Sequence, residues 1–432
     1  MFVVSSLRAH IMHAKQLRSM DSLVVAGWRP RGLFAVIPSP KVATTPCLSY
    51  RMKQPKTLFL VVIALLPLVL VSCSLFGAAP VSGGWSGTAF HDGIIYVGTR
   101  DGRVVAINAS SREQQWSWPD TDTSRSLIYT TPIVDGDLVY VGTYSGQVYA
   151  LTIDRGSERW VYPRTGSMGA IVGNPVIANE TMYVSSSDGR VYALDTIYGD
   201  LRWKSEPLAD KLWTSPVVVG DTLYVSTLDG HIYDLSLETG QSLGWSFKAE
   251  AGFASSPVVY EDHIYVGSFD RYLYAIEIGN NGSMWKFPQE EPAGNWFWAS
   301  PIVNEGIVYA ASLDGRLYGI NATTGGEMWS YTTKDQKDEP SPIVSSPVLV
   351  DNLLIVVNKS GTVYVFDLGA EFGDEVVPSK TIPIGADVRS SFYAQDGLAY
   401  VRDENNKDNQ LYVVDIDKGE VSWTFNLTEK EE

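Results

Sequence analysis

Short apolar runs separated by turn residues recur along most of the chain. In the clearest copy, residues 299–329, three runs are rich in β-branched and aromatic side chains, which is typical of strands. Asp314-Gly315 separates two of these runs, and this pair favours a type I′ hairpin turn because glycine readily adopts a positive φ. A Thr-Gly turn then precedes Trp329. The pattern predicts four short antiparallel strands with a large aromatic side chain on the last.

The same unit repeats with a period of 41 to 46 residues. The second strand of every copy carries an apolar residue at the same position within the repeat. These residues are Tyr96, Tyr140, Tyr183, Tyr224, Tyr265, Tyr309, Ile355 and Tyr400. A tryptophan follows about twenty residues later in all copies except the seventh: Trp116, Trp160, Trp203, Trp245, Trp285, Trp329 and Trp423. In the seventh copy, Val376 or Val377 stands where the tryptophan is expected.

Eight copies of a four-strand unit predict an all-β fold, an eight-bladed β-propeller of four-stranded antiparallel blades. A single blade cannot bury both of its faces, whereas a ring of blades can, with the tryptophans filling the space between neighbours. A solenoid is the competing repeat fold, but the hairpin turns inside every unit favour the propeller. The length of 432 residues alone would suggest two or three domains. The repeat instead predicts one ring in residues 85–432, with blades at 85–118, 128–162, 171–205, 212–248, 253–287, 297–332, 343–380 and 388–427.

The N-terminal part of the chain differs from the repeats. Residues 1–51 hold seven basic residues and one acidic residue without a sustained period, and we interpret them either as an extension ahead of a true start at Met52 or as a disordered segment. Residues 52–72 combine a basic start with an apolar run at 58–71, which is typical of a secretory signal. These 14 apolar residues are too few to cross a membrane comfortably.

Residues 70–73, Leu-Val-Ser-Cys, resemble the lipobox of bacterial lipoproteins, in which the cysteine is lipidated and becomes the new N-terminus. This resemblance predicts lipidation at Cys73, followed by a tether of small residues at 73–84. A generic signal peptide or an N-terminal anchor helix is the alternative. Cys47 is the only other cysteine, so the exported ring would contain no free thiol and no disulfide. The predicted location is extracytoplasmic, with the protein lipid-anchored to the bacterial cell membrane or outer membrane.

The charge balance limits the partners. The chain has 33 basic and 49 acidic residues, of which residues 1–72 hold nine and one, so the exported part carries 24 basic and 48 acidic residues and a net charge of −24. No basic stripe is present that would neutralise phosphates, which argues against nucleic acid as a partner. An acidic surface also disfavours an anionic bilayer, so contact with the membrane is expected only through the lipid anchor.

Three residues before the first-strand proline position, each repeat places a residue that should face the central channel. These positions and their neighbours are rich in aromatic side chains, and Tyr129, Trp213, Phe253, Trp298 and Arg389 are predicted to converge on one funnel. Aromatic residues and arginine are typical of protein-binding hot spots, and they also surround planar cofactors. The alternative is that these side chains plug the channel or pack between blades.

The segments Ser-Pro-Val at 256–258, Tyr-Val-Gly-Ser at 265–268, Tyr-Ala-Leu-Asp at 192–195 and Thr-Gly at 239–240 indicate a family. They resemble the PQQ-like repeat of eight-bladed quinoprotein propellers, and the likeness covers about 85–427. A lipid-anchored, single-domain version resembles the BamB-like lipoproteins, which act as scaffolds in outer-membrane protein assembly. The resemblance implies a non-catalytic ring that binds proteins.

Quinoprotein dehydrogenases of this fold hold the quinone against Ca²⁺ beside a neighbouring pair of cysteines, a carboxylate base and a stacking tryptophan. This chain has no adjacent cysteine pair and no dense acidic loop that could supply the roughly six to eight oxygen ligands of calcium, so we expect neither PQQ nor calcium, no metal and no catalytic residue. The Asp-Gly acids are scattered one per repeat, which turn chemistry explains. His91, His231 and His263 lie in different repeats without a metal-binding spacing.

The sequence therefore predicts an exported scaffold that contacts protein partners through a face of the ring or its loops. Two other classes stay open. One is a PQQ-dependent dehydrogenase, which the missing cysteine pair disfavours. The other is an extracytoplasmic ligand-sensing module, which the aromatic funnel would serve. Both end repeats have all the expected strands, so the pattern does not indicate how the ring closes.

Overall fold

A computed structural model of the protein describes residues 86–119, 126–253, 255–280, 282–369, 376–405 and 409–428. These residues all belong to the compact unit Ala78–Glu432. The predictions for residues 1–51, 52–72 and 73–84, including lipidation of Cys73, lie outside the described residues. Within the described ranges, no helix has the length and apolar character needed to cross a membrane.

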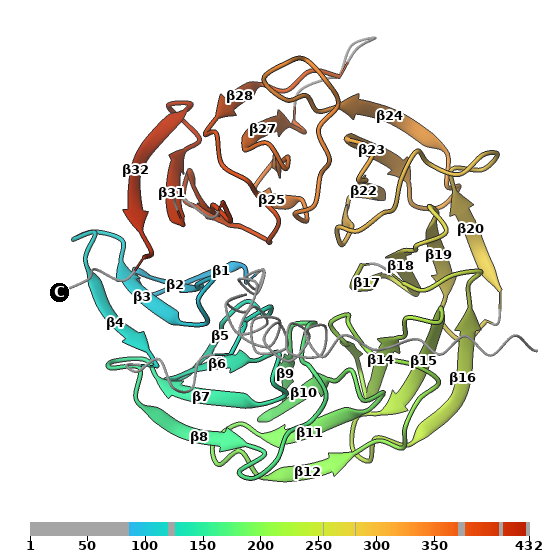
Figure 1. The fold of residues 1–432 in the computed structure, drawn as a ribbon. Coiled ribbons are helices and arrows are strands. Elements are labelled where there is room, and N and C mark those ends of the chain that lie inside the picture. Colours follow the sequence, from blue (N-terminus) through green and yellow to red (C-terminus); the bar gives the residue numbers. More distant parts are fainter. Residues whose placement is uncertain are drawn as a thin grey trace, which may run out of the picture. The chain divides into compact units, whose positions relative to one another are not determined.

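The described residues form eight antiparallel sheets of four strands, arranged as blades around a ring (Figure 1). Within each sheet the strands pair in chain order, so every blade is a simple meander. The first strand of a blade lies nearest the centre of the ring and the fourth forms its outer edge (Figure 1). The all-β, eight-bladed propeller predicted from the repeat is confirmed, and this part of the chain contains no helix.

Each blade is built from one repeat. Blade one contains β1 (Thr88–His91), β2 (Ile94–Gly98), β3 (Val104–Asn108) and β4 (Gln114–Trp118). Blade two contains β5 (Ile133–Asp135), β6 (Leu138–Gly142), β7 (Val148–Thr152) and β8 (Glu158–Tyr162). Blade three contains β9 (Val176–Ala178), β10 (Thr181–Ser185), β11 (Val191–Asp195) and β12 (Leu201–Lys204). Blade four contains β13 (Val217–Val219), β14 (Thr222–Ser226), β15 (His231–Ser236) and β16 (Ser242–Lys248).

The second half of the ring repeats this order. Blade five contains β17 (Val258–Tyr260), β18 (His263–Gly267), β19 (Leu273–Glu277) and β20 (Ser283–Phe287). Blade six contains β21 (Ile302–Asn304), β22 (Ile307–Ala311), β23 (Arg316–Asn321) and β24 (Glu327–Thr332). Blade seven contains β25 (Val348–Val350), β26 (Leu353–Val357), β27 (Thr362–Asp367) and β28 (Lys380–Pro383). Blade eight contains β29 (Tyr393–Gln395), β30 (Leu398–Arg402), β31 (Gln410–Asp415) and β32 (Glu420–Asn426).

The turn between the second and third strands differs from the predicted type I′ turn. In blade one the N–H of Gly102 donates to the backbone oxygen of Thr99 (3.2 Å), and Gly102 has a φ of 84° whereas Asp101 is not left-handed. This is a type I turn followed by one left-handed residue. The turn therefore needs a left-handed residue at a single position, which is glycine in blade one and Arg271, with a φ of 71°, in blade five.

Buried apolar side chains form eight clusters in the described residues, and each cluster is shared by two neighbouring blades. Between blades two and three, for example, Val148 and Trp160 pack with Met182 and Leu194. The second and third strands are buried on both faces, so residues 95–97 are completely inaccessible to solvent. The hydrophobic core is therefore divided among the blade interfaces, and no blade completes its core alone.

The repeated tryptophans fill these interfaces, as predicted. Trp160 packs on Tyr140 of its own blade, with ring centroids 5.8 Å apart, and its Nε1–H donates to the backbone oxygen of Thr196 in the next blade (2.9 Å). A Cβ atom added to Gly199 of that blade would lie 2.5 Å from the Trp160 ring. The indole thus lies against a turn that only glycine leaves open. The same donation to the next blade is made by Trp116, Trp203, Trp245 and Trp285.

In blade seven a different side chain donates the hydrogen bond to the next blade. The prediction that Val376 or Val377 takes the tryptophan position is wrong. Lys380 pairs with Val365 in the register that the tryptophans occupy in other blades. Its Nζ donates to the backbone oxygen of Ile416 in blade eight (2.8 Å). Because the segment before β28 is longer than in other blades, the blade ends beyond the predicted boundary at 380.

Blades one and eight close the ring without sharing strands, because each contains strands of its own repeat only. Polar side chains on each side donate to backbone oxygens on the other: Arg103 to Leu427 (2.8 Å), Thr88 to Tyr400 (2.8 Å) and Arg402 to Ser86 (3.2 Å). Arg112 adds a cation–π contact, 5.6 Å from the centroid of the Trp423 ring. Arg112 has a φ of 61° and stands where other blades place the glycine that covers the tryptophan.

A buried carboxyl lies next to this closure. Glu404 is 8% exposed and follows the 1% exposed Arg402 in blade eight. Burial raises the pKa of Glu404 to about 7, although the positive charge of Arg402 acts in the opposite direction. Glu404 therefore binds its proton more tightly in the folded ring than in the unfolded chain.

We expect Gly199→Ala to destabilise the ring more than Gly220→Ala. Both glycines have a positive φ (70° and 56°), so each alanine incurs similar backbone strain, about 1–2 kcal/mol. Only at Gly199 does the new Cβ meet Trp160, since nothing lies within 4 Å at Gly220. The clash adds about 1–3 kcal/mol, and thermal denaturation of the two variants measures the difference. Equal losses of stability would contradict the proposed importance of the tryptophan–glycine contact.

The free energy of unfolding is expected to fall as the pH rises from about 5 to about 8. A carboxyl whose folded pKa lies above its usual 4.5 favours folding while it is protonated, and this contribution is lost as the pH rises through about 7. At about 1.36 kcal/mol per pKa unit, the loss is at most about 3 kcal/mol. Glu404→Gln should remove this part of the pH dependence. Urea denaturation across this pH range tests it, and the same slope in the variant would sink the assignment to Glu404.

Candidate functional site

A cavity of about 140 Å³ lies where the chain leads into the innermost strands. Every blade contributes to its lining, from Gly87 in blade one to Ser391 in blade eight, and the lining residues precede the first strand of each blade. Since these strands surround the centre of the ring (Figure 1), the cavity lies at one mouth of the central channel. The described lining is formed mainly by hydroxyl, amide and aromatic side chains, with two valines, two glycines and one arginine, and it includes no aspartate, glutamate or histidine.

Four of the five predicted funnel residues line this cavity: Tyr129, Trp213, Trp298 and Arg389. They come from blades two, four, six and eight. The prediction, which took residues three positions before the first-strand proline position, therefore identified residues that are far apart in the chain but line one cavity. Trp213 is 36% exposed. Ala254, which has the same position in blade five, lies outside the described residues.

Phe253 is the exception, and its assignment to the funnel is wrong. It is 1% exposed and makes an edge-to-face contact with Tyr274, with centroids 6.4 Å apart, between blades four and five. Alternate residues of an extended segment point to opposite sides, and Phe253 precedes the cavity-facing position by one residue. The residues at its position in other blades are equally buried: Ile128, Ile171, Leu212, Phe297, Ile343 and Val388.

A belt of hydrogen bonds links the blades around the cavity. The backbone N–H of one lining residue donates to the side-chain oxygen of the equivalent residue in the next blade. The donor–acceptor pairs are Thr131 to Asn174 (2.8 Å), Asn174 to Ser215 (2.9 Å), Ser215 to Ser256 (2.9 Å), Ser256 to Ser300 (3.1 Å) and Ser300 to Ser346 (3.0 Å). We call these residues the polar belt, and it fixes blades two to seven relative to one another at the cavity wall.

Gly87 occupies the belt position in blade one and has no side chain to continue it. A Cβ atom there would lie 2.5 Å from Oγ1 of Thr131 and 2.9 Å from the backbone oxygen of Ser391. The missing side chain therefore lets blades one, two and eight approach closely beside the cavity, where the ring closes.

Two aromatic clusters flank the cavity, and only Tyr129 and Trp298 among their members were predicted to belong to it. Tyr129 contacts Tyr144 (ring centroids 5.3 Å apart), and Phe269 contacts both Trp296 (5.0 Å) and Trp298 (6.1 Å). Tyr144 is 47% exposed and Trp296 is 41% exposed. Tyr144 and Phe269 belong to the turns between the second and third strands. An aromatic residue in a turn was the signal that could have identified them.

Arg389, from blade eight, lines the cavity, and its positive charge is balanced by the carboxylate of Asp387. Its Nη2 and Nε groups donate to the two carboxylate oxygens of Asp387, at 2.7 and 3.1 Å. This interaction raises the pKa of Arg389 above its usual value. The cavity therefore has strong hydrogen-bond donors but little net charge from the described residues.

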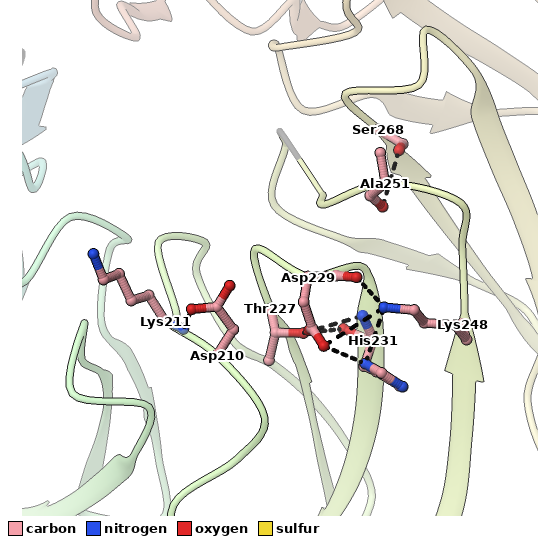
Figure 2. Close-up of polar contacts among 8 residues, drawn as sticks. All are labelled: Asp210, Lys211, Thr227, Asp229, His231, Lys248, Ala251 and Ser268. Atoms are coloured by element: carbon pink, nitrogen blue, oxygen red, sulfur yellow. Dashed lines mark hydrogen bonds and ion pairs between the residues drawn. The ribbon is translucent and has the colours of Figure 1, made fainter. Parts of the chain in front are cut away.

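The histidine at the hairpin turn of blade four belongs to a separate polar group (Figure 2). His231 Nδ1 lies 2.9 Å from Oδ2 of Asp229, and Nζ of Lys248 lies 3.5 Å from the same oxygen. Burial acts to raise the pKa of Asp229, but hydrogen bonds from Thr227 and His231 and the nearby positive charges lower it overall. Ser268, drawn in the same view, donates to a backbone carbonyl and not to His231, so the two do not form a nucleophile–base pair.

The acids of the equivalent turns in blades three, five and six act within their own blades. Asp188, Asp270 and Asp314 each accept a hydrogen bond from the tyrosine hydroxyl four residues later, at 2.6, 2.7 and 3.2 Å. These contacts support their interpretation as structural turn residues. Within the described ranges, no group of three or more His, Cys, Asp or Glu side chains is placed to hold a metal ion.

A family model described as "Outer membrane protein assembly factor BamB" matches residues 74–212 and 187–425, which is more than half of the chain. The chain belongs to this family. Comparison of this BamB-family chain with curated proteins found no match. The family assignment agrees with the PQQ-like repeat expected from the sequence.

Solved structures share the propeller fold of this BamB-family ring. BamB from Moraxella catarrhalis has a TM-score of 0.58 and 17% identity, covering 80% of this chain and 95% of that one. Quinohemoprotein alcohol dehydrogenase from Comamonas testosteroni has a TM-score of 0.57 and 14% identity, covering 77% and 70%. The computationally designed Ika8 protein has a TM-score of 0.59 and 14% identity, covering 74% and 93%. At these identities the likeness shows the fold alone, and function depends on the site.

Proposed function

We propose that this BamB-family ring is a non-catalytic scaffold that binds other proteins outside the cytoplasm, anchored to the bacterial envelope by a lipid on Cys73. The observation that carries this proposal is the match of the BamB family model to residues 74–212 and 187–425. The proposed role is in envelope or outer-membrane protein assembly, which is the role named in the family's description.

The accessible aromatic side chains beside the cavity support a role in protein binding. Tyr144, Trp213 and Trp296 are 47%, 36% and 41% exposed. Tryptophan and tyrosine are enriched in the few residues that contribute most of the binding energy at protein interfaces. These three residues come from blades two, four and six, so a partner that contacts all of them would cover the mouth of the channel.

A PQQ-dependent dehydrogenase is the alternative that the likeness to quinohemoprotein alcohol dehydrogenase favours. The residues that line the cavity do not favour that cofactor. Calcium needs about six to eight oxygen ligands, among which carboxylates supply the compensating charge, yet the described lining contains no aspartate or glutamate. Asp387, next to the lining, is paired with Arg389. The adjacent cysteine pair of those enzymes is also missing from the sequence.

Adding PQQ and Ca²⁺ to the intact protein is expected to leave its melting temperature and tryptophan fluorescence unchanged. A ligand present at about 100 times its Kd would stabilise the fold by about 2.7 kcal/mol, which thermal denaturation detects. A clear shift that disappears in Trp213→Ala and Trp298→Ala would instead assign the cavity to a cofactor and overturn the scaffold proposal.

Photocrosslinking in the bacterial host tests the scaffold directly. A photoreactive amino acid in place of Trp213 is expected to give a discrete adduct with a component of the outer-membrane assembly machinery, identified by mass spectrometry. The same amino acid in place of Asn304, the last residue of β21, is the matched control and should give none. Absence of an adduct at Trp213, or equal adducts at both positions, argues against the proposal.

Cell fractionation of Cys73→Ser tests the anchor, because the variant should leave the membrane fraction.

A further inference from the structure

The polar belt presents uncommitted hydrogen-bond donors to the cavity. Ser215, Ser256, Ser300 and Ser346 each accept a backbone N–H through the hydroxyl oxygen, and all four line the cavity. A hydroxyl that accepts such a bond still has its own hydrogen to donate. None of these four hydrogens has an acceptor within the described residues. One wall of the cavity is therefore a row of O–H donors held in place by the belt.

Asn174 extends this row of donors. Its side-chain atom facing Thr131 lies 2.8 Å from a backbone N–H, which can only donate, so that atom is the oxygen Oδ1. The Nδ2 group, with its two hydrogens, consequently has no partner among the described residues. Arg389 adds a further donor, because its contacts with Asp387 use Nε and Nη2 and leave Nη1.

We propose that this cavity binds a carboxylate group presented by a protein partner. A carboxylate accepts several hydrogen bonds at once, and such charge-assisted bonds are stronger than neutral ones. No described aspartate or glutamate lines the cavity to repel it. The proposal rests on the proposed function only for the statement that the carboxylate belongs to a protein.

The size and charge of the cavity favour a small monoanion. A volume of about 140 Å³ admits a terminal group or a side chain but not a folded element. A phosphate group, with a larger charge, would need uncompensated cations, and the arginine in the lining is already paired with Asp387. Trp213 and Trp298 stand in the same lining and offer aromatic surface for the apolar side chain next to the carboxylate.

Peptide titrations distinguish the two sources of a carboxylate. The probes are acetyl-Gly-Ala-Phe with a free C-terminus, the same peptide with a C-terminal amide, and acetyl-Gly-Glu-Phe amide, which carries its carboxylate on a side chain. Binding to the intact protein is followed by tryptophan fluorescence and calorimetry. At least one acidic peptide should bind at least about tenfold more tightly than the amide. Tighter binding of the first peptide identifies a partner's C-terminus, and tighter binding of the third identifies a glutamate or aspartate.

Asn174→Asp is the decisive variant. It keeps the oxygen that accepts the Thr131 N–H, so the belt and the melting temperature should be preserved, but it replaces the NH₂ donor with a negative oxygen. The affinity for the acidic peptide should fall at least about tenfold. Asn304→Asp introduces the same charge at the far end of β21 and should leave the affinity unchanged.

Three results would overturn the inference: equal affinity for acid and amide peptides, an unaltered affinity in Asn174→Asp, or no binding of either acidic peptide at millimolar concentration. These results are separable from failure of the scaffold proposal. If the Trp213 crosslink forms while the peptides fail to bind, the scaffold stands and the carboxylate site falls. If the peptides bind as expected without a crosslink, the cavity is a carboxylate site and the scaffold proposal falls.

Discussion

Each blade depends on the next one, because the indole N–H on its fourth strand finds its hydrogen-bond acceptor in that neighbour. A tryptophan such as Trp160 covers roughly 150–250 Å² of apolar surface, or about 4–6 kcal/mol before the cost of ordering is counted. Its Nε1–H is satisfied by the backbone of the next blade, and its ring is covered by a glycine there. Where the residues change, the contact survives: Lys380 donates to the next blade, and an arginine covers Trp423. The stability of each blade therefore depends on its neighbours in the ring.

The same arrangement determines the geometry of the cavity. Neighbouring blades are joined near their outer edges by the tryptophans and at the channel by the polar belt. Side chains that are 41 to 46 residues apart in the sequence are thereby held at fixed separations. Small polar residues on six different blades can then act together as one site, which no single blade or loop could form.

The repeat allowed much of this structure to be predicted, because its phase determines which residues share a position in every blade. That phase identified the ring, its strands, and four residues of the cavity wall. It failed for Phe253, since one step along an extended segment reverses the direction of a side chain. It failed again at Lys380, because a longer segment shifted the register and a lysine, unlike the tryptophans, does not mark the position. The polar belt could not be predicted, since it pairs backbone N–H groups with side chains across blades.

The correspondence between one repeat and one complete meander has a consequence for how such a chain can evolve. The boundaries of the repeat fall between blades, and the first and last blades borrow no strand from each other. Duplication or deletion of one genetic repeat would therefore add or remove an entire blade and leave no strand unpaired. The number of blades in this architecture can therefore change by one at a time, and only the contacts between the terminal blades would have to form anew.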